Sequence, residues 1–213
     1  MLAAVLAWLH APAFTLAGAP CSWAELLGDL TGVACVWLVA RQNLWTWPLG
    51  LANNLFWALL FFRARLYADS TLQGLFFALG IYGWWRWLRP RADGSGAAVR
   101  RTRAGEWWGQ LAAVASATLL IAAWLDRATD SPAPLADAAV LTLSLAATWG
   151  QAHKLLESWW IWIAVDVVSV PLYVSRGLYP TALVYGLFGG LCVVGLRAWT
   201  RELTGRAAGT AAP

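Results

Sequence analysis

The sequence has few charged residues for its length. Asp, Glu, Lys and Arg make up 12% of the 213 residues, whereas soluble domains contain roughly 25%. Apolar residues make up 60%, and Trp occurs 17 times. Many of these Trp residues stand at the ends of apolar runs, where a membrane interface favours them. The composition therefore predicts a membrane protein rather than a soluble one.

The residues of metal and nucleophilic chemistry are also scarce. There are two His, and the sequence contains neither an HExxH motif nor a nucleophile elbow. Glu25 and Asp29 in the first apolar stretch could form an acid–base pair or a proton relay, but solvated charge is the simpler interpretation. We expect no enzyme activity, no cofactor and no metal site. A receptor or an assembly scaffold remains an alternative.

Cysteine is rare and unpaired in the sequence. The three Cys residues form no CxxC pair, and two lie inside apolar stretches. This spacing indicates small buried residues rather than disulfides or metal ligands. They are Cys21, Cys35 and Cys192.

Long apolar runs, by contrast, are abundant. Seven of them come close to the roughly 20 residues that a bilayer-spanning helix needs: Ser22–Ala40, Trp47–Phe62, Ser70–Leu88, Trp107–Leu125, Leu135–His153, Trp159–Val174 and Pro180–Trp199. Residues 1–21 have no basic segment before their apolar run, so we expect an interfacial helix or a lead-in rather than a signal peptide. Residues 89–106 form a basic loop, and we expect a flexible tail from 201 to 213.

The basic residues are distributed unevenly between the two sides of this layout. Eleven of the 15 Lys and Arg fall in the loops after spans one, three and five and in the C-terminal tail. The positive-inside rule therefore predicts a cytoplasmic C-terminus. The Arg residues are scattered between apolar segments, which argues against a nucleic-acid partner.

The chain repeats itself at an offset of 112 residues. The matched pairs are Trp37–Trp149, Trp47–Trp159, Asn54–Asp166, Phe61–Tyr173, Phe76–Phe188, Gly83–Gly195 and Trp87–Trp199. Residues 22–88 and 135–200 are thus two copies of one three-helix unit. Because three is odd, a linker helix at 107–125 is needed to give both copies the same orientation. The predicted fold is an all-α polytopic membrane protein with seven spans, arranged as two parallel repeats.

The sixth span contains a carboxylate in an apolar setting. Trp159, Trp162, Asp166, Ser169 and Tyr173 follow helical spacing and share one face. A charge at this depth costs about 2.5–3.5 kcal/mol, so an intramembrane Asp indicates a functional site. The alternative is an Asp that only hydrogen-bonds a neighbouring helix.

The repeat places a second polar residue at the same depth. The face equivalent to that of Asp166 contains Asn54 among aromatic residues, and the third helices add Gln73 and Tyr185. Asn54 could instead join two helices, and the aromatic residues could be anchors or packing residues. The candidate substrate-binding residues are Trp47, Asn54, Trp57, Gln73, Trp159, Trp162, Asp166, Tyr173 and Tyr185.

Two segments resemble the PnuC-type nicotinamide riboside transporters. These are residues 47–87 and 154–199, with the LYAD run at Leu66–Asp69 and the ESWW-W-D-PLY pattern at Glu157–Tyr173. The resemblance implies a fold similar to the SWEET transporters, a homotrimer in the bacterial inner membrane, and facilitated uptake. It also implies that the ligand lies among the candidate residues. Family members often have Gln where this chain has Thr148.

The substrate is expected to lack a phosphate. Every Lys and Arg lies at the end of a span or in a loop, so a buried phosphate would have no partner. A pyridinium cation is favoured by Trp faces and by Asp166. We therefore expect a small-molecule substrate, nicotinamide riboside, which the protein carries across the lipid bilayer in which it is embedded. Thiamine or another B-vitamin is the alternative.

Overall fold

The computed structural model describes residues 2–16, 18–63, 67–89, 98–129 and 131–210. Within these ranges, one short hairpin, β1 (Pro12–Leu16) and β2 (Ala19–Ser22), accompanies the helices. The helices are α1 (Leu2–His10), α2 (Trp23–Ala40), α3 (Thr46–Arg63), α4 (Tyr67–Leu88), α5 (Ala104–Ala128), α6 (Pro134–Ala152), α7 (Ser158–Ser175) and α8 (Tyr179–Thr210). Helices α2 to α8 coincide with the seven apolar stretches of the sequence.

Local signals explain where several of these helices begin. At the start of α2, the Ser22 hydroxyl accepts a hydrogen bond from the Glu25 amide at 3.2 Å, and the Glu25 carboxylate accepts one from the Ser22 amide at 2.7 Å. This capping box satisfies backbone donors that the helix leaves free, so Glu25 has a structural role. Helix α6 begins with Pro134, whose missing N–H costs nothing in the first turn.

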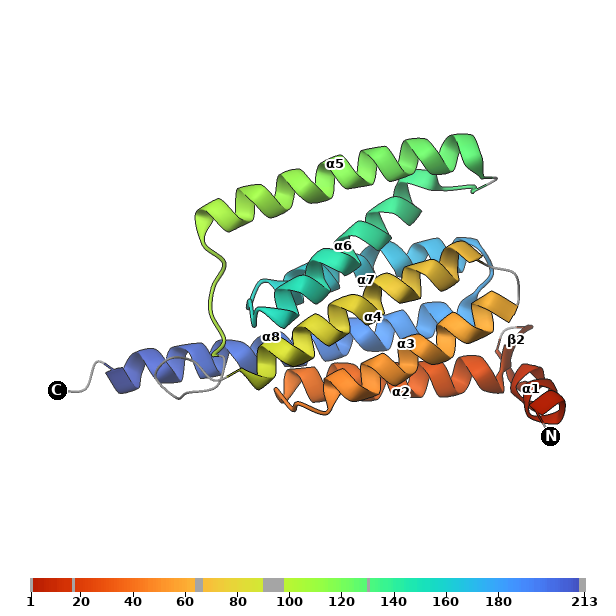
Figure 1. The fold of residues 1–213 in the computed structure, drawn as a ribbon, viewed down its shortest axis with the longest axis horizontal. Helices are drawn as coiled ribbons and strands as arrows, with labels where there is room; N and C mark the ends of the chain where they lie inside the picture. Colours follow the sequence, from red (N-terminus) through yellow and green to blue (C-terminus); the bar gives the residue numbers. More distant parts are fainter. Residues whose placement is uncertain (1, 17, 64–66, 90–97, 130, 211–213) are drawn as a thin grey trace.

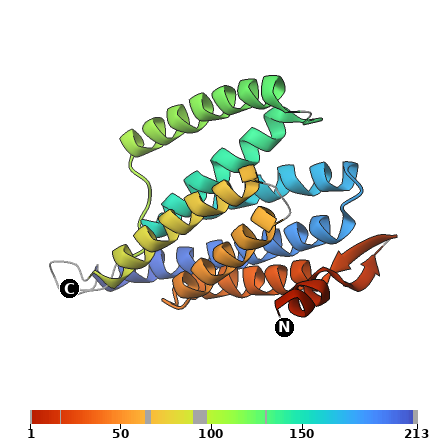
Figure 2. The same ribbon diagram turned by 45° about the vertical axis from the view of Figure 1, so that its right-hand side comes forward.

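Six of the helices close into a ring. Each packs against the next in the order α2, α3, α4, α6, α7 and α8, and α8 returns to pack against α2. Helix α5 packs on α6 outside this ring, has no buried residue, and lies apart from the other helices in both views (Figures 1 and 2). In this order α3 and α7, the helices that carry Asn54 and Asp166, occupy opposite positions.

The two ends of the ring differ. The hairpin and α1 lie at one end, which we name the hairpin end (Figure 1). The α2–α3 turn (41–45) and the α6–α7 turn (153–157) lie at the other, which we name the turn end. Helix α8 extends beyond the ring at the turn end (Figure 1).

The two halves of the ring contain the same core contact at the offset found in the sequence. The rings of Trp47 and Trp87 meet edge to face at 5.4 Å and 84°, and those of Trp159 and Trp199 do so at 5.4 Å and 86°. In each half a Gly allows the first Trp to approach. A Cβ on Gly83 would lie 2.1 Å from Trp47, and one on Gly195 would lie 2.4 Å from Trp159.

Replacing either of these glycines is expected to destabilise the protein. Gly83→Ala or Gly195→Ala puts a methyl group inside an indole ring, and overpacking of this kind costs about 1–3 kcal/mol or more. We expect each variant to unfold at a clearly lower temperature in detergent. Gly190→Ala is the matched control, because a Cβ there meets nothing within 4 Å. Equal melting temperatures for all three variants would contradict the packing assigned here.

The structure differs from the sequence-based expectation at both termini. The hairpin was not predicted, because its two strands, PAFTL and APCS, lack the alternation of apolar and polar residues that indicates a strand. A flexible tail was predicted from residue 201, whereas α8 is helical through Thr210. Thr204 bonds back to the Thr200 carbonyl at 3.1 Å, and Glu202 is bonded to Gln42 in the α2–α3 turn. The first bond lies within α8, and the Gln42–Glu202 bond ties the extension of α8 to the ring.

Four of the helices are long and apolar enough to cross a membrane: Trp23–Ala40, Ala104–Ala128, Ser158–Ser175 and Tyr179–Gly205. Within the described residues, the other ring helices, α3, α4 and α6, are not apolar enough to be recognised as spans by composition alone. The seven-span arrangement therefore stays a prediction.

Candidate functional site

Asp166 points into the protein from α7. Its side chain is 5% exposed, whereas its neighbour Val167 is 66% exposed. Ser169, one turn further along, is fully buried. The face that the sequence picked out by its spacing is therefore the buried face of α7, and the opposite face is the one open to the surroundings.

Asp166 packs against α8. A Cβ built on Gly189 would lie 3.7 Å from Asp166 Oδ2, an ordinary contact distance, so the carboxylate lies close to this part of α8. The Cys192 thiol, one turn further along α8, interacts with the same carboxylate. Cys192 is itself 3% exposed. Neither residue of α8 was among the candidates, because Gly and Cys in an apolar run give no sequence signal of a polar neighbour.

Several polar atoms on this face have no partner among the described residues. Around Asp166 they are Asp166 Oδ2, Ser169 Oγ and Trp162 Nε1, and the indole N–H of Trp159, in the core contact with Trp199, is unpaired as well. Buried polar atoms are nearly always hydrogen-bonded, and an unpaired one is costly. An acceptor and two donor-capable groups on one helix face therefore indicate a site for a polar ligand. Ser169 belongs to this group although it was not among the candidates.

Aromatic side chains lie on the hairpin side of Asp166. The rings of Tyr173 on α7 and Tyr185 on α8 are 5.0 Å apart and tilted by 41°. Tyr185 meets Phe188 edge to face at 5.9 Å, and Phe188 reaches the α2 backbone at Gly32. Thus α7 and α8 supply an aromatic wall next to the carboxylate, and this wall packs against α2.

The equivalent region of the first repeat is arranged differently. Trp57 lies over Gly28 of α2 and stacks on Phe61 at 5.4 Å. The amide of Asn53 donates to the Gly28 carbonyl at 2.9 Å and to Thr31 Oγ1 at 2.6 Å. Asn53 therefore joins α2 and α3, as does the Thr46 hydroxyl, which donates to the Cys35 carbonyl at 3.1 Å; the bonds considered for Asn54 are thus made by its neighbour. Asn54 and Gln73 are half-buried.

Trp47 and Trp159 are packed in the core near the turn end. They are 7% and 0% exposed, respectively, and each is enclosed by its Gly and Trp partners. The structure thus brings Trp162, Asp166, Tyr173 and Tyr185 together in the second repeat. It places Trp57, Asn54 and Gln73 in the first repeat, and holds Trp47 and Trp159 in tight packing. Their roles in binding stay predictions.

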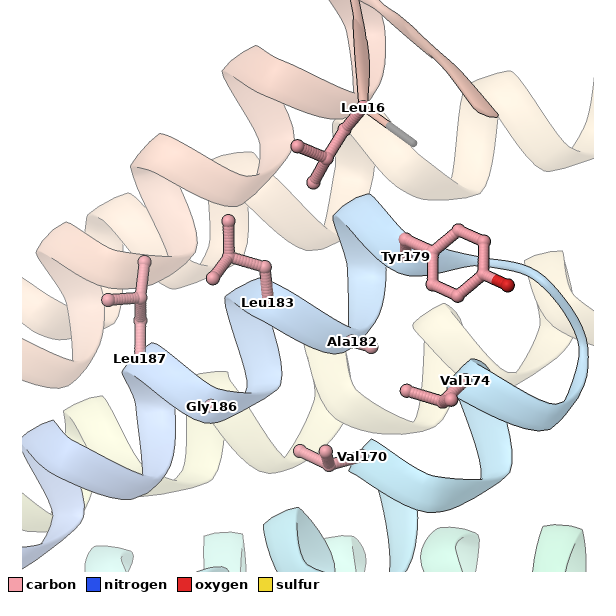
Figure 3. A pocket seen from close by; sticks show the side chains of 8 residues that line it. All are labelled: Leu16, Val170, Val174, Tyr179, Ala182, Leu183, Gly186 and Leu187. Atoms are coloured by element: carbon pink, nitrogen blue, oxygen red, sulfur yellow. The ribbon is translucent and has the colours of Figure 1, made fainter. Parts of the chain in front are cut away.

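An apolar groove lies elsewhere on the protein. It has a volume of about 480 Å³ and lies between α7, α8 and Leu16 of β1 (Figure 3). Val170 and Val174 line it from α7, and Leu183 and Leu187 from α8. Since Leu183 and Leu187 are more than half exposed, this groove belongs to the outer face of the ring. Its lining is almost wholly apolar, and the hydroxyl of Tyr179 points away from the other lining side chains (Figure 3), so the groove does not suit a charged substrate.

A buried carboxylate with one oxygen unpaired, inside a ring of largely apolar helices, is an arrangement that suits a membrane carrier for a small polar molecule. Comparison with known proteins also indicates a transporter. A family model described as "nicotinamide mononucleotide transporter" matches residues 22–201. The chain therefore belongs to this family, the PnuC family of vitamin transporters, and the family consists of transporters rather than enzymes.

Individual relatives differ in the substrate that their names give. The chain is 32% identical over 199 residues to the riboflavin/roseoflavin transporter RibM of Streptomyces davaonensis. The matched region covers 90% of this chain and 91% of RibM. It is 25% identical to the nicotinamide riboside transporter PnuC of Escherichia coli, over 84% of this chain and 85% of that protein. The crystal structure of a vitamin B3 transporter PnuC has the same fold, with a TM-score of 0.68 at 22% identity over 85% of this chain and 82% of that one.

Proposed function

We propose that this protein takes up nicotinamide riboside by facilitated diffusion, and that Asp166 receives the positively charged pyridinium ring. The observation that carries this proposal is the buried Asp166 carboxylate with one oxygen unpaired. A cation that enters the site supplies the missing partner. Trp162 and the Tyr173–Tyr185 pair supply aromatic faces, each of which attracts a cation by about 0.5–2 kcal/mol.

The membrane arrangement forms part of the same proposal. We infer seven spans, α2 to α8, as two parallel three-helix repeats with α5 as the linker, and transport by alternating access between the repeats. The excess of basic residues in the turn-end loops supports a cytoplasmic turn end and C-terminus. On this reading the protein resides in the bacterial inner membrane, as a homotrimer by its resemblance to the PnuC transporters.

Riboflavin is the second candidate, because the relative at 32% identity is named for riboflavin and roseoflavin. Riboflavin is uncharged at neutral pH and carries several hydroxyl groups, which the Asp166 carboxylate and Ser169 can also bond. It shares with nicotinamide riboside a flat ring and the lack of a phosphate. Thiamine, a quaternary cation, is favoured by the same charge argument as the riboside.

Purified protein in liposomes tests the proposal directly. We expect saturable uptake of radiolabelled nicotinamide riboside down its gradient, without an added ion gradient. Uptake of radiolabelled riboflavin and of radiolabelled thiamine is measured in the same way. If riboflavin is transported and the riboside is not, the chain has the specificity named for RibM. If none of the three is transported, the proposed function is wrong.

A further inference from the structure

The two turns at the turn end hold an unusual backbone conformation at equivalent positions. Within the described residues, Gln42 and Lys154 are the non-Gly residues with a positive φ, 53° and 52°. They are 112 residues apart, the offset of the internal repeat. A long side chain in this conformation is uncommon and persists where surrounding contacts hold it. Both repeats therefore place a strained polar residue at the same point.

These two side chains meet each other across the repeats. Lys154 Nζ donates a hydrogen bond to Gln42 Oε1 at 2.9 Å. The Gln42 amide in turn donates to the Glu202 carboxylate on α8. The Lys154 ammonium also lies 4.4 Å from the centre of the Trp87 ring on α4. Each of these contacts joins the first repeat to the second.

A segment of the loop between the repeats covers the same place. The Arg100 amide donates to the Lys154 carbonyl at 3.0 Å, and the Leu156 amide donates to the Arg100 carbonyl at 2.9 Å. Val99, beside this bridge, is 5% exposed and joins the packed core. That core also contains the four Trp of the repeat contacts, together with Cys192. The turn end is therefore closed by polar contacts over a packed apolar layer.

We propose that Gln42 and Lys154 form a latch that closes the turn end of the transporter and opens when substrate leaves toward that side. The inference rests on the proposed alternating-access function. Asp166 adjoins Cys192, which lies in the packed layer under the latch, so this layer has to separate for a molecule at Asp166 to pass. The Gln42–Lys154 bond joins the two repeats only while the turn end is closed. Removing this bond therefore destabilises the closed state relative to the state that is open at the turn end.

Cys192 provides a built-in reporter of opening. With Cys21 and Cys35 replaced by Ser, the rate at which a small maleimide modifies Cys192 in purified protein measures exposure of the layer. We expect Lys154→Met to raise this rate about tenfold or more, the size of effect of one charge-assisted hydrogen bond. Lys154→Arg keeps the charge and should give a rate close to that of the parent. Arg41→Met, which removes an exposed cation stacked on Trp37, is the control.

A second reporter separates opening from general loosening. Ala138 on α6 is fully buried and lies toward the hairpin end, and the Ala138→Cys variant with Cys192 replaced by Ser reports on that end. The latch predicts that Lys154→Met speeds modification of Cys192 and leaves the Ala138→Cys reporter unchanged or slower. Faster modification of both reporters, or no change at Cys192, overturns the proposal. The readout needs no substrate, so its failure is distinct from failure of the proposed function.

Discussion

Asp166→Asn is expected to lower the affinity for nicotinamide riboside by about 10- to 100-fold, because a hydrogen bond or contact to a charged group contributes about 1.5–3 kcal/mol. The substitution keeps the shape of the side chain and removes its charge. Riboflavin is uncharged, and the amide of Asn can still bond its hydroxyl groups. The affinity for riboflavin should therefore change by no more than about threefold. The two ligands are compared by calorimetric titration of the same purified protein.

The control for this variant is Asp126→Asn, which removes an exposed carboxylate from the end of α5. It should leave both affinities unchanged. Because the charge removed from Asp166 is buried, the variant should also insert and fold at least as well as the parent. Riboside binding at the parent affinity by Asp166→Asn would show that Asp166 does not carry the recognition of the cation.

The sequence predicted the ring helices well because two independent patterns agreed on them. Apolar runs of spanning length located α2 to α8, and the offset of 112 residues related Trp47 to Trp159. The structure shows the same Trp–Trp geometry in both halves, which a helix face repeated in sequence makes inevitable once both copies fold alike. The buried orientation of Asp166 followed from helical spacing alone.

The sequence could not assign functions to individual aromatic residues. Spacing places Trp159 and Trp162 on one face of α7, yet Trp159 is fully buried against Gly195, whereas Trp162 is only partly buried. The difference depends on where small residues of a neighbouring helix fall, which is a matter of tertiary packing. The same holds for Asn53 and Asn54, adjacent in sequence, of which Asn53 makes the bonds to α2.

The latch was also beyond sequence reasoning. Gln42 and Lys154 differ in chemistry, so the repeat alignment gave no reason to pair them. Their equivalence became visible through backbone conformation and a direct hydrogen bond. A pseudo-symmetric fold brings equivalent turns together near its axis, and this can be recognised only when both repeats are placed in space.

Phosphorylated forms of the vitamins are expected to be rejected, although the family description names a mononucleotide. The ring interior near Asp166 contains a carboxylate with one oxygen unpaired, and the basic residues of the described chain lie in loops, at the ends of the apolar stretches or on the part of α8 beyond them. Arg176 at the hairpin end is paired with Asp137 at 2.9 Å, and Lys154 is held in the turn-end contacts. A phosphate in the site would be buried without a cation and close to a like charge. Such burial costs several kcal/mol, equivalent to a loss of about 1,000-fold or more in affinity.

Titration with matched pairs measures this discrimination. Nicotinamide riboside is compared with its mononucleotide, and riboflavin with its 5′-phosphate, so that within each pair only the phosphate differs. The expected result is the same for either vitamin, since it depends on the missing cation and not on the ring. Asp166→Asn should reduce the difference in affinity within each pair, because it removes the repulsion between the carboxylate and the phosphate. The difference should not vanish, since the phosphate still lacks a cationic partner. Binding of a phosphorylated form as tight as that of its parent would mean that a basic side chain reaches the site during transport, and the assignment of Asp166 as the central charge would then be wrong.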